Sequence, residues 1–556
     1  MFTITFKRKG SSDVKVTASP GDNILELAMQ AGVAIDAPCS GNGTCGKCFV
    51  KVISGAVESE KSVKISEEDY EDGWRLSCQS KVMCDATLFV PASAESFKSD
   101  IQTADLSSQE ELARYFELVT GIFNTGIQKG DVGVGNGIAV DIGTTTVTAA
   151  LLRLKSGFIK AKASLGNGQI IYGADVINRI IQQGKPGGVD KLRRAVREET
   201  VIPLIETLCK DAGIEPTDVS RMVIAGNTTM EHLFVGANGD SIRLEPYEPE
   251  FLELRGKTAA DLGLPVAPDA PVVFAPNVGS YVGGDITAGV LTTLMWNNPE
   301  MTLFIDLGTN GEMVLGNSDF MLTCACSAGP AFEGGDISCG MRATHGAIES
   351  CTIDAETMEP TMGIIGEGAK PIGLCGSGII DVISELFRCG IINAKGKFVR
   401  DGERILRDEY GAAYVLAFAK DSGIGKDVTI NEIDIDNFIR AKAAIFSAIR
   451  AMLNAVDMTP DDIDYIMIAG GIGSGIDIAK SISIGMLPKL PLDKYIYIGN
   501  SSLTGACAML ISNDATEKVH EISANMTYLE LSTHPGYMDE FVAACFLPHT
   551  DASLFD

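Results

Sequence analysis

The feature that most constrains this fold is a glycine-rich loop, residues 39–48, which carries the three thiols Cys39, Cys45 and Cys48. Three glycines between these cysteines allow the loop to wrap tightly and to expose its backbone N–H groups. A fourth thiol follows 30 residues later at Cys78. Four thiolates in this arrangement predict an iron–sulfur cluster.

Two alternatives stay open for this loop. The thiols could be free or hold a structural zinc ion, although zinc sites usually use paired Cys-x2-Cys hooks and only one is present. Cys84 could replace Cys78 as the fourth ligand. The five-residue first gap and the sequence Arg-Leu-Ser-Cys-Gln around Cys78 resemble the [2Fe–2S] ferredoxins, in their adrenodoxin-like branch. This resemblance implies an α+β β-grasp domain over residues 1–92, with the four cysteines named above as ligands.

The residues before the loop agree with this fold. Residues 2–7 and 14–17 alternate between apolar and polar, as half-buried strands do. Residues 23–31 are typical of a short helix that stops at Gly32. Strand, turn, strand and helix are the start of a β-grasp domain.

Length and charge limit what the rest of the chain can be. At 556 residues it is too long for one hydrophobic core, so several domains are expected. Lys and Arg number 45 against 73 Asp and Glu, and the net charge of -28 argues against nucleic acid or an anionic membrane as a partner. The sequence has no secretory signal core and no apolar run of about 18 residues. We therefore expect a cytoplasmic, anaerobic setting, with the 14 cysteines as thiols or metal ligands.

A strand, a tight turn and a second strand are indicated around Asp141. The turn reads Asp141-Ile-Gly143-Thr144-Thr145-Thr146. Gly143 allows the backbone to approach an anion, and the N–H and hydroxyl groups that follow can bind phosphate oxygens. Asp141 would hold Mg²⁺ through water, because Mg²⁺ keeps several of its waters.

The same pattern recurs 165 residues later. Asp306-Leu-Gly308-Thr309-Asn310 is again a turn between two apolar, strand-like runs. One such hairpin is weak evidence because Asp-x-Gly turns are common. Two of them predict duplicated lobes that face one nucleotide.

A third element, residues 465–475, is typical of a buried strand that enters a loop with Gly470, Gly471 and Gly473. Small residues in such a loop let an adenosine lie against the backbone. Lys442 precedes this element in a strongly helical run. It is predicted either to contact the nucleotide or to be a surface lysine.

Three further polar turns stand out. Asn227 follows the apolar run Ile-Ala-Gly, and Gly376 and Ser377 begin a helix that could cap a phosphate. The third turn follows the second hairpin and contains Ser327 and the sequence Ala-Gly-Pro-Ala-Phe-Glu.

In this order the motifs resemble the phosphate 1, phosphate 2 and adenosine motifs of the actin, hexokinase and heat-shock ATPase superfamily. The resemblance implies two α/β lobes of RNase H-like fold, residues 137–298 and 299–556, with the C-terminal segment returning to the hinge. Residues 279–289 and 499–508 resemble its connecting helices, which would cross at small residues. Asp285 lies where an acidic residue often orients the attacking water; a helix cap is the alternative.

Residues 93–136 separate the two halves and are rich in Ser, Ala, Gln and Asp. A capping box at 108–111 predicts the start of a helix within them. Its predicted apolar face consists of Leu112, Tyr115, Phe116 and Val119. This linker is either a connector docked on the next domain or a tether that lets the first domain swing.

The whole chain resembles the reductive activators of corrinoid-dependent enzymes, the RACE family. The likeness lies in the cysteine loop and in Ala-Val-Asp-Ile-Gly-Thr-Thr-Thr, Ala-Gly-Pro-Ala-Phe-Glu-Gly and Leu-Cys-Gly-Ser-Gly. It implies an ATP-hydrolysing enzyme that passes one electron from its [2Fe–2S] cluster to the inactive Co(II) corrinoid of a methyltransferase system and restores Co(I). The cofactors implied are the cluster, ATP and Mg²⁺. The partners implied are the corrinoid protein and an external low-potential electron donor; we also expect a homodimer, with Ser327 as the group that approaches the cobalt.

Three other functions share some of these parts. A small-molecule kinase fused to a ferredoxin would need a substrate base and would gain nothing from an electron carrier. Activators of 2-hydroxyacyl-CoA dehydratases resemble the ATPase half but hold a [4Fe–4S] cluster between two subunits. The cysteine loop argues against an actin-like filament protein.

Overall fold

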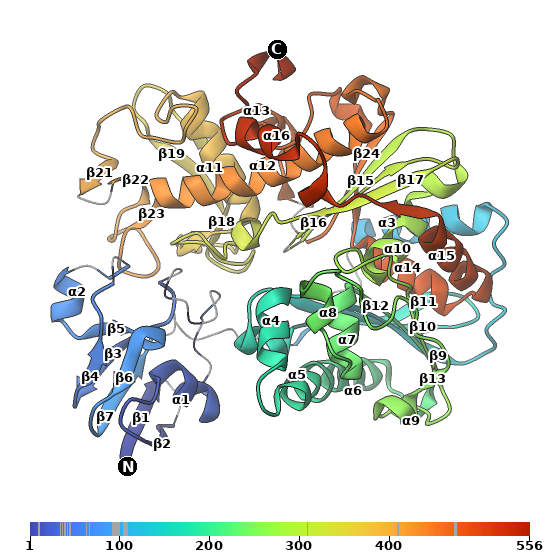
Figure 1. The fold of residues 1–556 in the computed structure, drawn as a ribbon, viewed down its shortest axis with the longest axis horizontal. Helices are drawn as coiled ribbons and strands as arrows, with labels where there is room; N and C mark the ends of the chain where they lie inside the picture. The colour runs from blue at the N-terminus through green and yellow to red at the C-terminus, as the bar shows by residue number, and fades with distance from the viewer. Residues whose placement is uncertain are drawn as a thin grey trace.

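A small N-terminal domain lies beside a larger body of two lobes in the computed structural model of this chain (Figure 1). The structure describes residues 1–8, 12–33, 35, 37, 41, 43, 46–62, 64–65, 67–91, 101–103, 109–308, 310–408, 411–471 and 475–555. Cys39, Cys45, Thr309, Gly473 and the capping serine of the linker lie outside the described residues.

The N-terminal domain is a β-grasp fold, as predicted. Its five-stranded sheet has the order β2-β1-β7-β3-β5, in which β1 runs antiparallel to β2 and parallel to β7. Apolar residues of α1 pack on this sheet, and the Asn23 side chain caps the helix by accepting from the N–H groups of Leu25 and Glu26. The elements are β1 (Phe2–Arg8), β2 (Val14–Ala18), α1 (Ile24–Gln30), β3 (Phe49–Ser54), β4 (Val57–Ser59), α2 (Glu67–Glu71), β5 (Trp74–Leu76), β6 (Ser80–Val82) and β7 (Ala86–Val90).

The linker helix is docked on the larger body. α3 (Gln109–Asn124) buries Tyr115, Val119 and Ile122 against α10 and α14, and β8 (Gln102–Thr103) pairs with the edge of the lobe I sheet. The predicted apolar face is wrong at Phe116, which is exposed, because Ile122 one turn beyond Val119 completes the buried stripe. For the described part of the linker, the structure therefore favours a connector over a tether.

Lobe I contains a seven-stranded sheet in the order β13-β14-β12-β9-β10-β11-β8. Ile138 and Val140 of β9 face the cluster of α4–α7, while Ala139 faces α10 and α14, so the sheet is buried on both sides. The strands are β9 (Asn136–Ile142), β10 (Thr146–Arg153), β11 (Phe158–Gly166), β12 (Val219–Gly226), β13 (Lys257–Thr258) and β14 (Pro271–Phe274). The helices are α4 (Val176–Gln183), α5 (Gly188–Val196), α6 (Ile202–Ala212), α7 (Thr228–Val235), α8 (Asp240–Arg243) and α9 (Ala259–Leu262).

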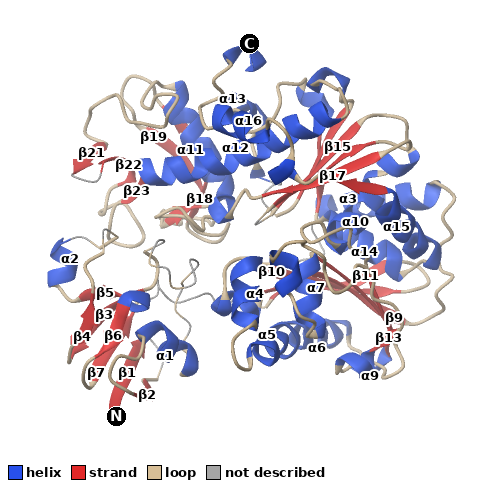
Figure 2. Ribbon diagram, viewed as in Figure 1, coloured by secondary structure: helices blue, strands red, loops and turns tan. Residues whose placement is uncertain are grey.

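Lobe II repeats this arrangement in a six-stranded sheet of order β25-β24-β15-β16-β17-β26. In both lobes an antiparallel meander of three strands is followed by parallel strands on the side of its first strand (Figure 2). The predicted duplication is therefore confirmed. The sheet strands are β15 (Thr302–Leu307), β16 (Gly311–Gly316), β17 (Met321–Cys326), β24 (Tyr465–Ala469), β25 (Tyr495–Gly499) and β26 (Met526–Tyr528).

Two three-stranded sheets extend lobe II and pack with its long helices. Their strands are β18 (Ala347–Ile353), β19 (Pro360–Ile364), β20 (Gly373–Leu374), β21 (Ile405–Asp408), β22 (Gly411–Ala417) and β23 (Val428–Asn431). The remaining helices are α10 (Gly284–Thr293), α11 (Gly376–Arg388), α12 (Glu432–Ala455), α13 (Ile478–Ser483), α14 (Ser501–Leu510), α15 (Asn513–Asn525) and α16 (Tyr537–Ala544). Among the described residues, no helix combines the length and apolar character needed to cross a bilayer.

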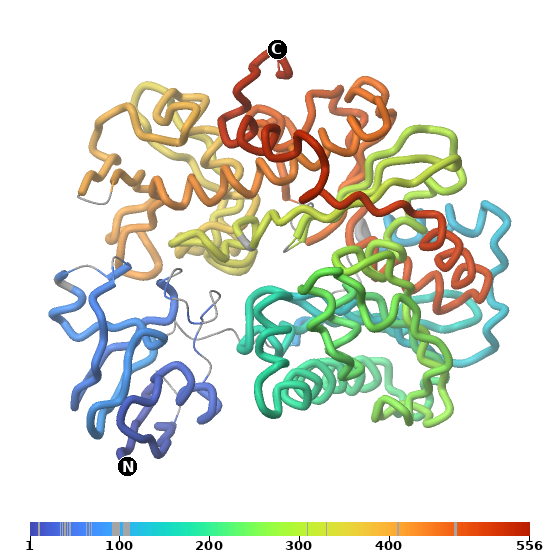
Figure 3. Tube along the Cα trace, viewed as in Figure 1, coloured from blue at the N-terminus to red at the C-terminus, as the bar shows by residue number. Residues whose placement is uncertain are grey.

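α10 and α14 cross at small residues, as predicted. A Cβ atom added to Gly505 would lie 1.9 Å from the Ala288 carbonyl oxygen, and one added to Gly289 would lie 2.9 Å from the Ser501 hydroxyl. After this crossing, the chain runs from α14 and α15, beside the lobe I sheet, back across lobe II to the C-terminus (Figure 3).

Candidate functional site

The turn between β9 and β10 is held from several sides. The Gly143 N–H donates to the Thr146 carbonyl at 3.1 Å, which closes the turn. Asn227 caps α7 through the Met230 N–H and donates from Nδ2 to the Thr144 hydroxyl at 3.0 Å. The structure thus brings the predicted residues Asn227 and Gly143–Thr146 together.

Arg179 supports the same turn and was missed by sequence reasoning. Its side chain is fully buried, and its guanidinium donates to the carbonyls of Thr144 at 2.6 Å and Gly173 at 2.8 Å. Burial lowers the pKa of Arg179 to about 9, although Asp175 and Glu333 favour the charged form. No local pattern distinguishes this arginine from others on exposed helix faces.

The two predicted hairpins and the start of α10 bring acidic groups together. Asp141 and Asp306 are each the last residue but one of their strands, β9 and β15, and Asp285 is the second residue of α10. Burial, followed by the charges of Asp306 and Asp141, raises the pKa of Asp285 to about 8. Burial and the charge of Asp141 raise the pKa of Asp306 to about 7. The repulsion between these carboxylates helps to raise their pKa values, although the described His, Cys, Asp and Glu side chains form no group of three or more that could hold a metal ion.

Glu312 joins this group and was not among the predicted site residues. It is the second residue of β16, the second strand of the lobe II hairpin, and its side chain is buried. Burial, with the charges of Asp285 and Asp306, raises its pKa well above the usual range. The sequence could have indicated Glu312, because it lies two residues beyond Asn310 and alternate residues of a strand share one face.

The geometry at Asp285 bears on whether it is only a helix cap. The capping position of α10 is Gly283, and the Asp285 carboxylate accepts from the Ile286 N–H at 2.9 Å. The charges of Asp306 and Asp141 act on this carboxylate, and its own charge acts on Glu312. The side chain therefore belongs to the acidic group as well as to the helix terminus.

The lobe II turn and the glycine loop after β24 lie against each other. The Gly308 N–H donates to the Asn310 carbonyl at 3.1 Å. Gly470 has a φ of 95°, and a Cβ atom there would lie 2.3 Å from the Leu307 carbonyl and 2.9 Å from Asp306 Oδ1. Only glycine fits at this contact. The next residue, Gly471, is exposed with open space around it.

The start of α11 reaches the same loop. A Cβ atom on Gly475 would lie 3.2 Å from the Ser377 hydroxyl. That hydroxyl already donates to the Glu349 carbonyl at 2.9 Å. Gly376 and Ser377 are therefore placed beside the predicted adenosine loop, with backbone N–H groups as the donors left to meet a ligand.

The predicted surface position of Lys442 is wrong, and the structure argues against a nucleotide contact. Its side chain is fully buried, and Nζ donates at 2.6 Å to the carbonyls of both Phe546 and Pro548 and at 3.5 Å to that of Gly485. The ammonium is therefore hydrogen-bonded to the C-terminal segment and is not at the surface. Periodicity within α12 does not reveal which later segment covers the helix.

The described part of the cysteine loop fits a bound cluster. The Ser77 N–H donates to the Cys48 carbonyl at 2.9 Å, which joins the segments of the third and fourth cysteines. A Cβ atom on Gly41 would lie 3.7 Å from Cys78 Cβ, so the loop and Cys78 face each other. Cys84 Sγ instead accepts from the Ala56 N–H at 3.2 Å. This geometry favours Cys78 over Cys84 as a ligand.

The turn after β17 reaches across to lobe I. Ser327 follows the last residue of the strand and is exposed. Six residues later, Glu333 Oε2 accepts from the Thr145 hydroxyl at 2.8 Å. A residue of the second lobe thus contacts the phosphate-type turn of the first, a contact that no local motif predicted.

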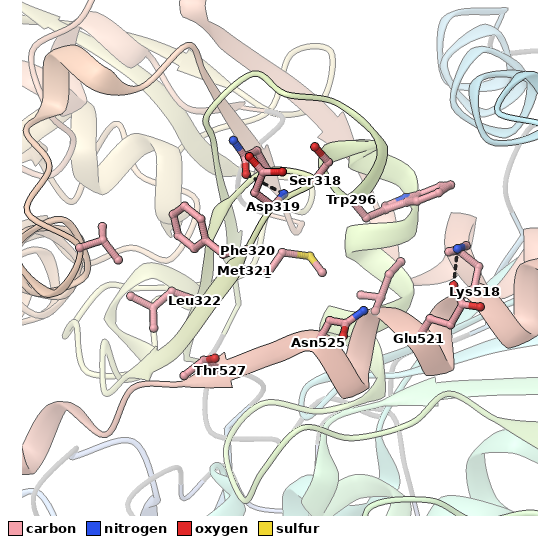
Figure 4. A pocket seen from close by; sticks show the side chains of 13 residues that line it. Trp296, Ser318, Asp319, Phe320, Met321, Leu322, Lys518, Glu521, Asn525 and Thr527 are labelled. Carbon is pink, nitrogen blue, oxygen red and sulfur yellow. Dashed lines mark hydrogen bonds and ion pairs between the residues drawn. The ribbon is translucent and has the colours of Figure 1, made fainter.

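A pocket of about 590 Å³ lies at the opposite end of the lobe II hairpin (Figure 4). Phe320 and Leu322 of the β16–β17 hairpin line one side, and α15 lines the other. Lys518 of α15 lies 5.2 Å from the centre of the Trp296 ring. The residues of the nucleotide-type motifs are not part of its lining.

Taken together, fold and site define a class: ferredoxin-linked ATPases, in which a β-grasp iron–sulfur domain precedes two actin-like lobes with facing hairpins. Models of protein families divide the chain in the same order. Residues 7–83 match the 2Fe-2S iron-sulfur cluster binding domain, 136–298 the RACo middle region, and 300–556 the C-terminal domain of RACo, the ASKHA domain. The chain belongs to the RACo family.

Individual relatives agree with this assignment. The corrinoid activation enzyme RamQ of Eubacterium limosum is 36% identical over 73% of this chain and 69% of its own length. The [Co(II) methylated amine-specific corrinoid protein] reductase of Methanosarcina barkeri is 25% identical over 70% of this chain and 73% of its own. A solved structure, a reductive activator for corrinoid,iron-sulfur protein, covers 100% of both chains with 39% identity and a TM-score of 0.70.

Proposed function

We propose that this chain is an ATP-dependent reductive activator that returns the inactive Co(II) corrinoid of a methyltransferase system to Co(I) with one electron. The observation that carries the proposal is the joining, in one chain, of a cysteine loop that fits a [2Fe–2S] cluster to facing hairpins with crowded carboxylates. The names of the relatives, which refer to corrinoid activation and to reduction of a corrinoid protein, support the substrate class.

The nucleotide half has a role for each group. Asp141 and Asp306 would hold Mg²⁺ through water, and the N–H and hydroxyl groups of Thr144–Thr146 would bind phosphate oxygens. The carboxylate of Asp285, brought to ionisation by the cation, would accept a proton from the water that attacks the terminal phosphorus, so that ADP and phosphate leave. The loop at Gly470 and Gly471 would bind the adenosine.

Further groups complete this half. Gly308, Thr309 and Asn310 would bind phosphate in lobe II, and Asn227 would do so from lobe I. The helix start at Gly376 and Ser377, with Gly473, would border the nucleotide. The division that we propose is 1–92 for the ferredoxin domain, 93–136 for the linker, and 137–298 and 299–556 for the lobes.

The electron-transfer half depends on the cysteines. Cys39, Cys45, Cys48 and Cys78 would hold the cluster, which supplies a one-electron carrier when bound. Clusters of the plant type have potentials near about −400 mV, and each 59 mV uphill makes a one-electron transfer about tenfold less favourable. We propose that the energy of ATP acts on the partner's cobalt, with Ser327 approaching it, and that an external low-potential donor reloads the chain, which works as a homodimer.

The partner's oxidation state provides the test of this assignment. ATP hydrolysis by the anaerobic, cluster-loaded chain should rise when a Co(II) corrinoid protein is added and should stay at its basal rate with the same protein in its methyl-Co(III) form. The phosphate release rate measures both. Equal rates with the two forms would contradict the proposal, since a kinase or an unrelated ATPase does not distinguish them.

A further inference from the structure

One loop of lobe II contacts both the phosphate-type turn of lobe I and the cysteine loop. In this contact loop, defined as residues 333–340, the Glu333 carboxylate accepts from the Thr145 hydroxyl at 2.8 Å. Lys47, one residue before the ligand position Cys48, donates to the carbonyl of the neighbouring Gly334 at 2.7 Å. The same ammonium donates to the Gly340 carbonyl at 3.3 Å. Glu333 and Gly334, which are adjacent in sequence, thus contact the Thr145 turn and the cysteine loop.

The contact loop is shaped to present its two carbonyls to one ammonium. Gly334 has a φ of 75°, and a Cβ atom there would lie 2.5 Å from the Met341 backbone nitrogen. A Cβ atom on Gly340 would lie 2.3 Å from the Gly334 carbonyl oxygen. Only glycine permits this close approach of the two ends. Glu333 and Gly334 are neighbours in sequence, so a shift of the backbone at Glu333 moves the Gly334 carbonyl.

A second contact supports the same docked position of the N-terminal domain. Lys426, in the loop between β22 and β23, lies 3.7 Å from the Asp69 carboxylate and 5.9 Å from the centre of the Trp74 ring. Figure 1 shows this part of lobe II next to α2 and β5. Because this ion pair is exposed, we expect it to contribute less than the Lys47 hydrogen bonds.

The Thr145 hydroxyl belongs to the turn that we propose binds phosphate. A phosphate oxygen on this hydroxyl would lie against the Glu333 carboxylate, and two anions at hydrogen-bond distance repel each other. The Arg179 guanidinium attracts the Glu333 carboxylate in this position, so Glu333 loses that attraction when it leaves Thr145. Phosphate and Glu333 therefore compete for Thr145.

We propose that the contact loop makes nucleotide binding and docking of the N-terminal domain oppose each other. Phosphate on Thr145 displaces Glu333, and Lys47 then loses its hydrogen bonds to the Gly334 and Gly340 carbonyls. Nucleotide binding thereby releases the docked N-terminal domain. The inference rests on the proposed function for the role of the Thr145 turn. Coupling of this kind is reciprocal: docking weakens nucleotide binding by the same factor by which nucleotide binding weakens docking. Weakening the Lys47 contact must therefore strengthen nucleotide binding.

Lys47→Gln tests the coupling in the full, cluster-loaded chain. The probe is a non-hydrolysable ATP analogue with Mg²⁺, and its Kd is measured by calorimetry. Lys47→Gln should bind it at least about 5-fold more tightly than the unchanged chain. Lys15→Gln is the matched control, because Lys15 is exposed on β2, at the opposite edge of the sheet from β5; its Kd should not change. Equal Kd values for all three would overturn the inference.

The radius of gyration from small-angle scattering gives the second readout. It should increase when the analogue is added to the unchanged chain and should already be large in Lys47→Gln. If Lys47→Gln loses its cluster, Lys426→Gln takes its place, because it weakens the docking from lobe II. It should lower the Kd of the analogue and increase the radius of gyration, each by less than Lys47→Gln would. An unchanged chain that binds the analogue without expanding would overturn the coupling alone. A chain that fails to bind the analogue would overturn the proposed function and the coupling together.

Discussion

Asp141 of lobe I and Asn500, which caps α14 in the C-terminal half, are joined by a hydrogen bond of 2.8 Å from Nδ2 to Oδ2. Ser502 donates to the other carboxylate oxygen at 2.8 Å. These bonds offset part of the burial that raises the pKa of Asp141. A helix whose sequence lies 359 positions away therefore keeps this carboxylate oriented and easier to ionise.

Asn500→Ala should lower ATP hydrolysis by about 10-fold or more, since groups that orient a metal-binding carboxylate typically contribute that much. The loss should be smaller at saturating Mg²⁺, because the main effect is weaker cation binding. Asn317→Ala is the control: its side chain donates to the Pro299 carbonyl at 2.9 Å, at the other end of lobe II. Equal Mg²⁺ dependence in Asn500→Ala and the unchanged chain would exclude this role.

The raised pKa values of the acidic group predict how stability depends on pH. Asp285, with a pKa of about 8, keeps its proton in the folded protein at pH values where the unfolded chain has lost it. Stability should therefore fall as the pH rises from about 4 to about 8. In EDTA, the decrease in Tm between about pH 6 and about pH 8 should be smaller in Asp285→Asn than in the unchanged chain, by about 2 °C or more.

Mg²⁺ should reverse this effect, because it stabilises the ionised carboxylates. The gain in Tm on adding Mg²⁺ should be larger near pH 8 than near pH 6. A gain that is independent of pH, or one that survives in the double variant Asp141→Asn, Asp306→Asn, would show that the cation binds elsewhere.

The two candidate fourth cysteines can be told apart by substitution. Cys78→Ser should lose most of the visible absorption of the cluster, whereas Cys84→Ser should keep it, because Cys84 faces Ala56 and Cys78 faces Gly41. Both variants should retain basal ATP hydrolysis, since the lobes have their own core. The reverse pattern of absorption would assign Cys84 as the ligand.

Lys442→Met should destabilise the chain without changing nucleotide binding. The substitution leaves the partly buried carbonyls of Phe546 and Pro548 without their donor, a loss of about 2 kcal/mol in the free energy of unfolding. Denaturant unfolding measures this loss, and the Kd of the ATP analogue should match that of the unchanged chain. If a stably folded Lys442→Met protein bound the analogue more weakly, Lys442 would be assigned to the nucleotide contact that the structure argues against.

Local patterns located Asp141 and Asp306 because a strand, a tight turn and a glycine occur together in sequence. The β-grasp start was also predictable, since it depends on residues close together along the chain. The crossing of α10 and α14 at Gly505 joins distant segments and was expected only from the resemblance to the ATPase superfamily. Arg179, Asn500 and Glu333 were missed because they reach the site from distant elements. The error at Lys442 has the same cause: the segment that covers it lies about a hundred residues further on.

The central claim is that one chain uses ATP to deliver an electron to a Co(II) corrinoid. Its most direct test is the Co(I) absorption band of a corrinoid protein mixed anaerobically with the reduced, cluster-loaded chain. The band should grow with Mg²⁺ and ATP, and it should stay absent with Asp306→Asn, which spares the cluster, and with Cys48→Ser, which spares ATP hydrolysis. Co(I) that forms equally well without ATP, or with Cys48→Ser, would contradict the account.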